Sequence, residues 1–244
     1  MSNQELITGK LANPEGEALD YAFQASRVKP ARGLVIIGHG VTANKDREWA
    51  VVLADALGAA GFASLRFSFA GNGDSEGDFR ASCPTKETSD ARAALDFVSE
   101  QYDGPVYFAG HSMGAAVGVL LAATETRLEG LVSLAGMVHT HDFAQRKFGD
   151  QTPGQSLMWD KPECPLSQVF MDDMRAVDSV LSLAPQIQIP WLLIHGSEDT
   201  VVPLTESEQI AAQAPDAQLQ VLTSADHVFS DSAEDMARTV CDWL

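Results

Sequence analysis

Cysteine is scarce in this chain of 244 residues, which contains three, at positions 83, 164 and 241. No two of them form a C-x-x-C pair, so the sequence contains neither a disulfide framework nor a typical zinc-binding pattern. This scarcity favours a reducing compartment, and we expect a cytoplasmic protein. Residues 1–5 lack the basic start of a signal peptide, which supports the same expectation.

Basic residues are also few, because 16 lysines and arginines stand against 34 aspartates and glutamates, a net charge of −18. A surface of this charge repels nucleic acid and anionic membranes, so we expect neither as a partner. The longest apolar stretch, residues 115–123, is too short to span a bilayer. We therefore expect a small molecule as the partner, and the sequence leaves the oligomeric state open.

The chain does contain a regular alternation of apolar runs and helical patterns. Some runs, such as residues 34–37, are apolar throughout, which is typical of strands covered on both faces. Strands are predicted at residues 34–37, 63–69, 106–109, 131–135, 190–194 and 219–222, and helices at residues 46–60, 85–101, 113–123, 166–183, 203–214 and 232–244. Two alternating segments, near residues 5–11 and 18–24, predict an initial hairpin. The sequence thus predicts a single α/β domain over residues 1–244, with a mostly parallel sheet of about eight strands and helices on both faces.

One long segment departs from this alternation. More than fifty residues separate the predicted strands at 131–135 and 190–194, and prolines interrupt them. Ligands bind beyond the carboxyl ends of parallel strands, and this segment starts at such an end. Long irregular segments in compact domains are usually functional, so we predict a lid or substrate-pocket insertion at residues 137–165. Aromatic and methionine side chains that could line a pocket are Phe143, Phe148, Met158, Trp159 and Phe170.

The strongest motif is Gly110-His111-Ser112-Met113-Gly114, which lies between a predicted strand and an apolar predicted helix. In that context a G-x-S-x-G sequence forms a sharp turn that presents the serine hydroxyl at the edge of the sheet. The glycines remove side chains that would collide with neighbouring backbone. Ser112 is therefore the predicted nucleophile.

A serine hydroxyl is a weak nucleophile unless a base removes its proton. Of the six histidines, only His227 follows the last predicted strand, where this fold places its base. Asp199 is the predicted acid that orients His227, with Glu198 as the nearest competitor and Asp226 as a weaker one. The chain order serine, aspartate, histidine is that of an α/β-hydrolase.

Two backbone N–H groups should stabilise the oxyanion of the tetrahedral intermediate. The residue after the nucleophile, Met113, supplies one, and we predict that Val41 supplies the other, with Gly40 as the second choice. This chemistry needs no cofactor and no metal. The spacing His139-x-His141-Asp142 is too common to indicate a metal site.

These motifs together resemble the α/β-hydrolase superfamily over nearly the whole chain. Residues 39–45 and 66–77 are similar to a bacterial subgroup that includes cinnamoyl and feruloyl esterases and serine aminopeptidase-like enzymes. The chain has Ser68 and Asn72 where that subgroup usually has aspartate and histidine. The resemblance implies a serine hydrolase, and we expect a carboxylesterase that acts on a small acyl or aromatic ester through an acyl-enzyme on Ser112.

Two alternatives stay open at this stage. The same triad could cleave an amide or a thioester, since an aminopeptidase needs only an acidic group for the substrate ammonium. A catalytically silent binding protein on a hydrolase fold is the alternative of another class, because fold does not imply function.

Overall fold

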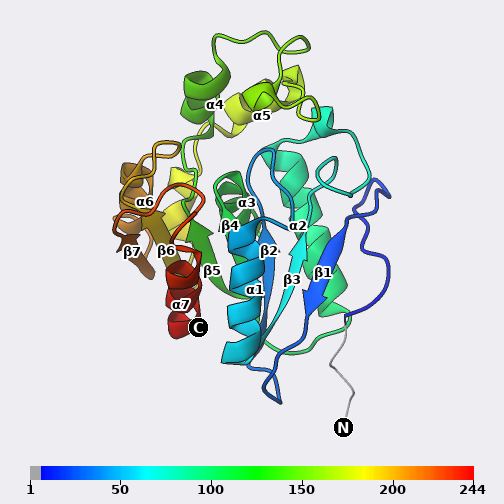
Figure 1. Cartoon of the computed structure of the whole chain (residues 1–244), viewed down its shortest axis with the longest axis vertical. Coiled ribbons are helices and arrows are strands. Elements are labelled where there is room, and N and C mark those ends of the chain that lie inside the picture. Colours follow the sequence, from blue (N-terminus) through cyan, green and yellow to red (C-terminus); the bar gives the residue numbers. More distant parts are fainter. Residues whose placement is uncertain (1–6) are drawn as a thin grey trace.

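The computed structural model describes residues 7–244, which contain one seven-stranded sheet of order β1-β3-β2-β4-β5-β6-β7. β1 runs antiparallel to β3, and the other neighbouring strands are parallel. The strands are β1 Tyr21–Gln24, β2 Gly33–Gly38, β3 Phe62–Phe67, β4 Val106–His111, β5 Leu128–Leu134, β6 Trp191–Gly196 and β7 Ala217–Leu222. The α-helices are α1 Glu48–Ala60, α2 Pro84–Ser99, α3 Met113–Ala122, α4 Thr140–Phe148, α5 Gln168–Val177, α6 Leu204–Ala211 and α7 Ala233–Trp243. This architecture confirms the predicted fold class (Figure 1).

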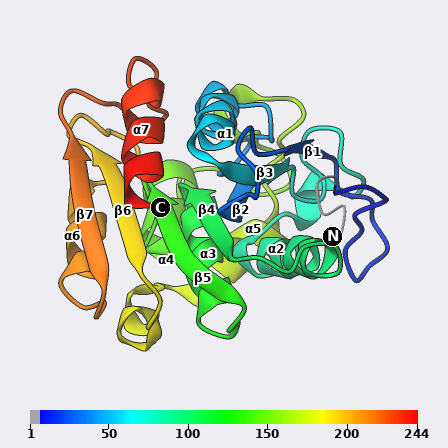
Figure 2. The same ribbon diagram turned by 90° about the horizontal axis from the view of Figure 1, so that it is seen from below.

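Helices cover both faces of the sheet, with α1 and α7 on one face and α2 and α3 on the other (Figure 2). The alternation of side chains along β2 shows why. Leu34 and Ile36 belong to the hydrophobic cluster that includes α2 and α3, whereas Val35 and Ile37 belong to the cluster with α1 and α7. A strand buried on both faces must be apolar at every position, as the sequence pattern indicated.

The predicted N-terminal hairpin is wrong in its pairing. Its first half lies partly in residues 1–6, outside the described part of the chain. The turn after Asn13 forms, but the segments on its two sides pair through only one isolated β-bridge, between Ala12 and Ala18. β1 instead pairs with β3, which satisfies the backbone groups along that edge of the sheet.

The segment between β5 and β6 contains more regular structure than expected. It forms α4, a 3-10 turn η2 at Met158–Asp160, α5, and a 3-10 helix η3 at Leu181–Gln186. The predicted helix at residues 166–183 is interrupted because Asp178 has φ 59°, so α5 ends at Val177. α4 and α5 lie together beyond one end of the sheet, at the top of Figure 1.

A third hydrophobic cluster attaches this segment to the body of the protein. Phe143 of α4 and Phe170 of α5 pack with Met113, at the start of α3, and with Val202. The segment is therefore seated over the residues that follow β4 and β6. Within residues 7–244, no helix combines the length and apolar character needed to cross a membrane.

Candidate active site

Ser112 occupies a sharp turn between β4 and α3, with φ 54° and ψ −118°. This conformation is costly for a residue with a side chain, and the glycines around it make the turn possible. A Cβ atom on Gly110 would stand 2.1 Å from the carbonyl oxygen of Gly114, and one on Gly114 would stand 2.4 Å from that of His39. Both contacts are with backbone, which cannot move aside, so the motif requires glycine at both positions.

The three residues predicted as a triad lie in hydrogen-bond contact. His227 Nε2 is 3.1 Å from Ser112 Oγ, and His227 Nδ1 is 2.7 Å from Asp199 Oδ2. An ionised carboxylate only accepts hydrogen bonds, so Nδ1 carries the proton and Nε2 is left to accept from the serine hydroxyl. The hydroxyl and the imidazole are thus arranged for proton transfer from serine to histidine.

Asp199, not its neighbours, contacts the histidine. Its Oδ1 accepts hydrogen bonds from the backbone N–H groups of Val201 and Val202 at 2.8 and 2.9 Å. Burial alone would raise the pKa of the Asp199 carboxyl, but hydrogen bonds from His195 and His227 hold it well below its usual value. Asp199 is therefore ionised at neutral pH, as the orienting acid must be.

The two competing carboxylates are placed elsewhere. The side chain of Glu198 is exposed. Asp226 accepts hydrogen bonds from the backbone N–H and the hydroxyl of Ser230, at 2.9 and 2.7 Å, and stabilises the turn before α7.

Two histidines that the sequence analysis left without a role support this arrangement. His195 Nε2 lies 3.2 Å from Asp199 Oδ2, so the buried carboxylate faces two imidazoles. His111 Nε2 lies 2.8 Å from the carbonyl oxygen of His227, and the His111 ring packs between Trp49 and His227. His111 directly precedes Ser112 and His195 stands four residues before Asp199, and these positions were the signal available in the sequence.

The burial of His111 predicts an acid-sensitive contribution to stability. Burial, and secondarily the nearby His227, lowers the pKa of His111 from 6.5 to about 3. Below pH 6.5 the unfolded chain takes up this proton and the folded chain does not, so acid favours unfolding until pH falls through the folded pKa. Chemical denaturation at pH 7.5 and pH 5 should show a loss of about 2 kcal/mol from this group, absent in His111→Phe.

The matched control for this experiment is His141→Gln, which changes a partly exposed histidine of α4. That variant separates the effect of His111 from the effect of removing any one imidazole. An identical pH dependence in wild type and His111→Phe would show that His111 is not a buried neutral imidazole.

The loop after β2 lies directly against the serine. A Cβ atom on Gly40 would stand 2.8 Å from the Cβ of Ser112, so a glycine is needed for this approach. His39 anchors the loop, because its Nδ1 lies 2.9 Å from the carbonyl oxygen of Gly40 while its Nε2 accepts a hydrogen bond from the N–H of Phe69. Burial lowers the pKa of His39 to about 4, which keeps the ring neutral in this role.

Val41 and Met113 are both available as donors beside Ser112. Met113 is the first residue of α3, where the N–H has no partner within the helix. Val41 lines the pocket in front of the serine. In the part of the chain that the structure describes, no hydrogen bond engages the backbone N–H of either residue.

The serine and His227 open into a pocket of about 170 Å³. Two of the five side chains predicted to line a pocket, Phe143 and Trp159, do so. The other three, Phe148, Met158 and Phe170, are buried in the cluster beneath the insertion and are not part of the pocket wall. Thr42, Arg47, Trp49, Val201 and Val228 also line the pocket, and the sequence analysis did not single them out.

Neither of the two departures from the subgroup pattern reaches this pocket. Ser68 is fully buried, and its hydroxyl accepts a hydrogen bond from the N–H of Lys45. Asn72 is also buried and donates to the carbonyl oxygen of Ala70. A larger cavity of about 280 Å³ lies beside Phe23 and Tyr102, at the opposite end of the strands, and contains neither the serine nor its histidine.

The histidines of the insertion are used for other contacts. His139 Nε2 lies 2.5 Å from Gln209 Oε1, and His141 Nδ1 lies 3.5 Å from a carboxylate oxygen of Asp178. No group of three or more histidine, cysteine, aspartate or glutamate side chains within residues 7–244 is placed to hold a metal ion.

Comparison with known families identifies the chain. Residues 29–159 and 162–230 match the Hydrolase_4 family, which is described as serine aminopeptidase. The chain belongs to this family. The matched residues include Ser112, Asp199 and His227, and the match agrees with the superfamily and subgroup that the sequence resembled.

Two curated relatives are similar to this chain over most of its length. The hydrolase is 25% identical to the mitochondrial palmitoyl-protein thioesterase ABHD10 of Rattus norvegicus, over 95% of this chain and 80% of that protein. It is 30% identical to an uncharacterized protein of Mycobacterium tuberculosis, over 69% of this chain and 54% of that protein.

Solved structures show the same fold. The hydrolase resembles Est1E of Butyrivibrio proteoclasticus, solved with bound ferulic acid, with a TM-score of 0.83, 21% identity and 97% of each chain covered. It also resembles α/β-hydrolase domain-containing protein 10 from mouse, with a TM-score of 0.77, 20% identity, and 96% of this chain and 97% of that chain covered.

Proposed function

We propose that this hydrolase cleaves a carboxylic ester of a small acyl or aromatic acid through an acyl-enzyme on Ser112. The observation that carries the proposal is the continuous chain of contacts from Ser112 Oγ through His227 to the buried Asp199, open to a pocket at the serine. All three members are present, which argues against a catalytically silent binding protein.

In this proposal His227 Nε2 takes the hydroxyl proton as Ser112 Oγ attacks the substrate carbonyl. Asp199 stabilises the imidazolium and holds the required tautomer. The N–H groups of Val41 and Met113 donate to the oxyanion, the alcohol leaves with the proton from His227, and water activated by His227 then releases the acid. No cofactor takes part.

The pocket favours an ester over the amide substrate of an aminopeptidase. An aminopeptidase would need a carboxylate for the substrate ammonium, but none of the residues lining the pocket within the described chain is acidic. The volume of about 170 Å³ suits a short acyl chain or a single aromatic ring. A thioester is the second candidate, because the relative from Rattus norvegicus is named a palmitoyl-protein thioesterase.

The position of α4 and the turn at residues 158–160 supports the proposal that residues 137–165 form the lid or wall of this pocket. Phe143 and Trp159 are contributed from that segment. A cytoplasmic location also stays a proposal, based on three cysteines that form no disulfide in the described structure.

A substrate panel tests the proposed function. Purified protein should be assayed with aryl acetate, butyrate and laurate, phenyl ferulate, acetyl and butyryl thioesters, and an aminoacyl anilide. We expect turnover of the acetate, butyrate or ferulate esters, with less on laurate and none on the anilide. Anilide cleavage without ester cleavage would overturn the proposal in favour of an aminopeptidase.

A further inference from the structure

The charged side chain that lines the pocket is basic, although the chain as a whole is strongly acidic. The chain carries 34 acidic and 16 basic residues, yet the one lysine, arginine, aspartate or glutamate among the described residues that line the pocket is Arg47. In a random draw from this composition an acidic residue would be the more common. The pocket wall in front of Ser112 thus contains no acidic side chain, although acidic residues outnumber basic ones in the chain.

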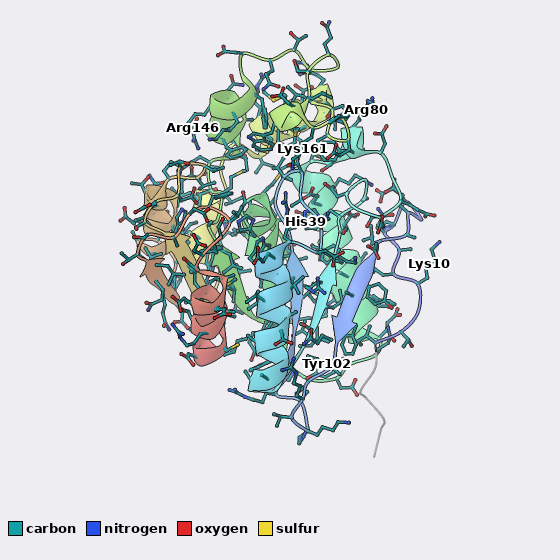
Figure 3. All side chains as sticks on the ribbon, viewed as in Figure 1. Lys10, His39, Arg80, Tyr102, Arg146 and Lys161 are labelled. Atoms are coloured by element: carbon teal, nitrogen blue, oxygen red, sulfur yellow. The ribbon has the colours of Figure 1, made fainter. Side chains whose placement is uncertain are left out.

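Further cations, from α4 and from the turn after residue 160, contact the two loops that form the wall. Lys161 Nζ, from the insertion, lies 3.2 Å from both the carbonyl oxygen and the hydroxyl of Thr42, a residue of the wall. On the β6 side, Lys147 Nζ lies 3.4 Å from the carbonyl oxygen of Thr200, and Arg146 reaches that of Val201 at 3.4 Å. Figure 3 shows Lys161 between the insertion and the sheet.

These cations are largely left without acidic partners. Within residues 7–244, no carboxylate lies within ion-pair distance of Arg47, Lys147 or Lys161, whereas Arg146 pairs with Glu206 at 3.4 Å. Asp160 and Glu163 flank Lys161 in sequence and are exposed, but neither forms an ion pair with it.

Asp46 and Glu48 both flank Arg47 in sequence, and neither forms an ion pair with it. Asp46 pairs with Lys45 and Arg66, at 2.6 and 3.0 Å. Neither neighbouring carboxylate pairs with Arg47, and its side chain lines the pocket in front of the serine.

We propose that the substrate carries an anionic group, a carboxylate or a phosphate, close to its scissile ester, and that Arg47 and Lys161 bind that group. This inference rests on the proposed function, since it specifies the substrate class of the same site. Arginine presents a planar set of donors to a carboxylate or phosphate, and lysine adds a point charge. An overall negative protein needs such a local positive region to admit an anion.

Two matched sets of esters test the inference on either side of the scissile bond. On the alcohol side, 4-acetoxybenzoate and 4-acetoxyphenyl phosphate are compared with neutral methyl 4-acetoxybenzoate. On the acyl side, phenyl 4-carboxybenzoate is compared with its methyl-capped diester. We expect kcat/KM for at least one anionic ester to exceed that of its neutral partner by about tenfold. The preferred set then shows whether the anion belongs to the acyl or the alcohol part, and the first set separates carboxylate from phosphate.

The ratio of anionic to neutral kcat/KM is then measured in variants. Arg47→Gln and Lys161→Gln should each lower that ratio by about threefold, Arg47→Lys should lower it less, and the double variant Arg47→Gln/Lys161→Gln should bring it close to one. Lys10→Gln is the matched control, because Lys10 is an exposed cation far from Lys161 in Figure 3, and it should leave the ratio unchanged. Added salt should lower the rate on the anionic ester more than on the neutral one.

Equal or better turnover of both neutral esters by the wild type, or a ratio unaffected by Arg47→Gln and Lys161→Gln, would overturn the inference. Neither result would affect the proposed function, because Ser112-dependent turnover of the neutral esters would persist. Loss of turnover on every ester would instead contradict the proposed function itself.

Discussion

Replacing Ser112 by alanine is expected to lower kcat for ester hydrolysis by about 10⁶-fold, since the nucleophile of a triad acts as a unit with its base. The substitution removes only the hydroxyl that contacts His227 Nε2 at 3.1 Å. Because alanine is smaller than serine, it introduces no steric clash in the buried turn. The measurement is steady-state hydrolysis of an aryl butyrate, with thermal denaturation to show that the variant is folded.

Ser197→Ala is the matched control for this prediction. Ser197 lies two residues before Asp199, and its hydroxyl accepts a hydrogen bond from the N–H of Ser224 away from the pocket. It should keep nearly full activity. A Ser112→Ala protein that is folded and retains wild-type turnover would show that another group attacks the ester.

Replacing Asp199 by asparagine is expected to lower kcat by about 10⁴-fold. The structure explains why this nearly isosteric change should matter so much. Oδ1 accepts two hydrogen bonds from the N–H groups of Val201 and Val202, so the amide oxygen of an asparagine would stay there. Its NH₂ group would then face His227 Nδ1, which favours the tautomer with the proton on Nε2, the wrong nitrogen for a base.

The neighbouring carboxylates provide matched controls for Asp199→Asn. Glu198→Gln alters an exposed side chain, and Asp226→Asn alters the turn held by Ser230. Both should retain activity within a few-fold of wild type. A large loss in Glu198→Gln with little loss in Asp199→Asn would show that Glu198 orients the histidine.

The parts of the structure that follow from local pattern were predictable from the sequence. Apolar runs such as residues 34–37 identified strands buried on both faces, and G-x-S-x-G identified the turn at Ser112 because only glycines allow it. Asp199 and His227 follow successive strands, and the carboxyl ends of parallel strands lie at one edge of a sheet. The sequence therefore predicted that these two side chains lie close together.

Features that depend on distant contacts were not predictable. β1 forms its backbone hydrogen bonds with β3, which lies far along the chain, and not with the segment just before it. A local sequence pattern cannot show this pairing. In the insertion, periodicity could not show that Phe143 and Trp159 face the pocket while Phe148 and Phe170 pack beneath it. The role of His111 likewise depends on Trp49 and His227, which are distant in the sequence, and that of His195 depends on how the loop carrying Asp199 folds back onto it.

The most direct test of the central claim is to trap the acyl-enzyme. The protein is mixed with an excess of an aryl butyrate, quenched in acid within milliseconds, digested and mapped by mass spectrometry. We predict a butyryl group on Ser112, in the peptide that contains Gly110–Gly114, and its absence from Ser112→Ala. Butyryl transfer to a different residue, with turnover preserved in Ser112→Ala, would contradict the assignment of Ser112 as the nucleophile.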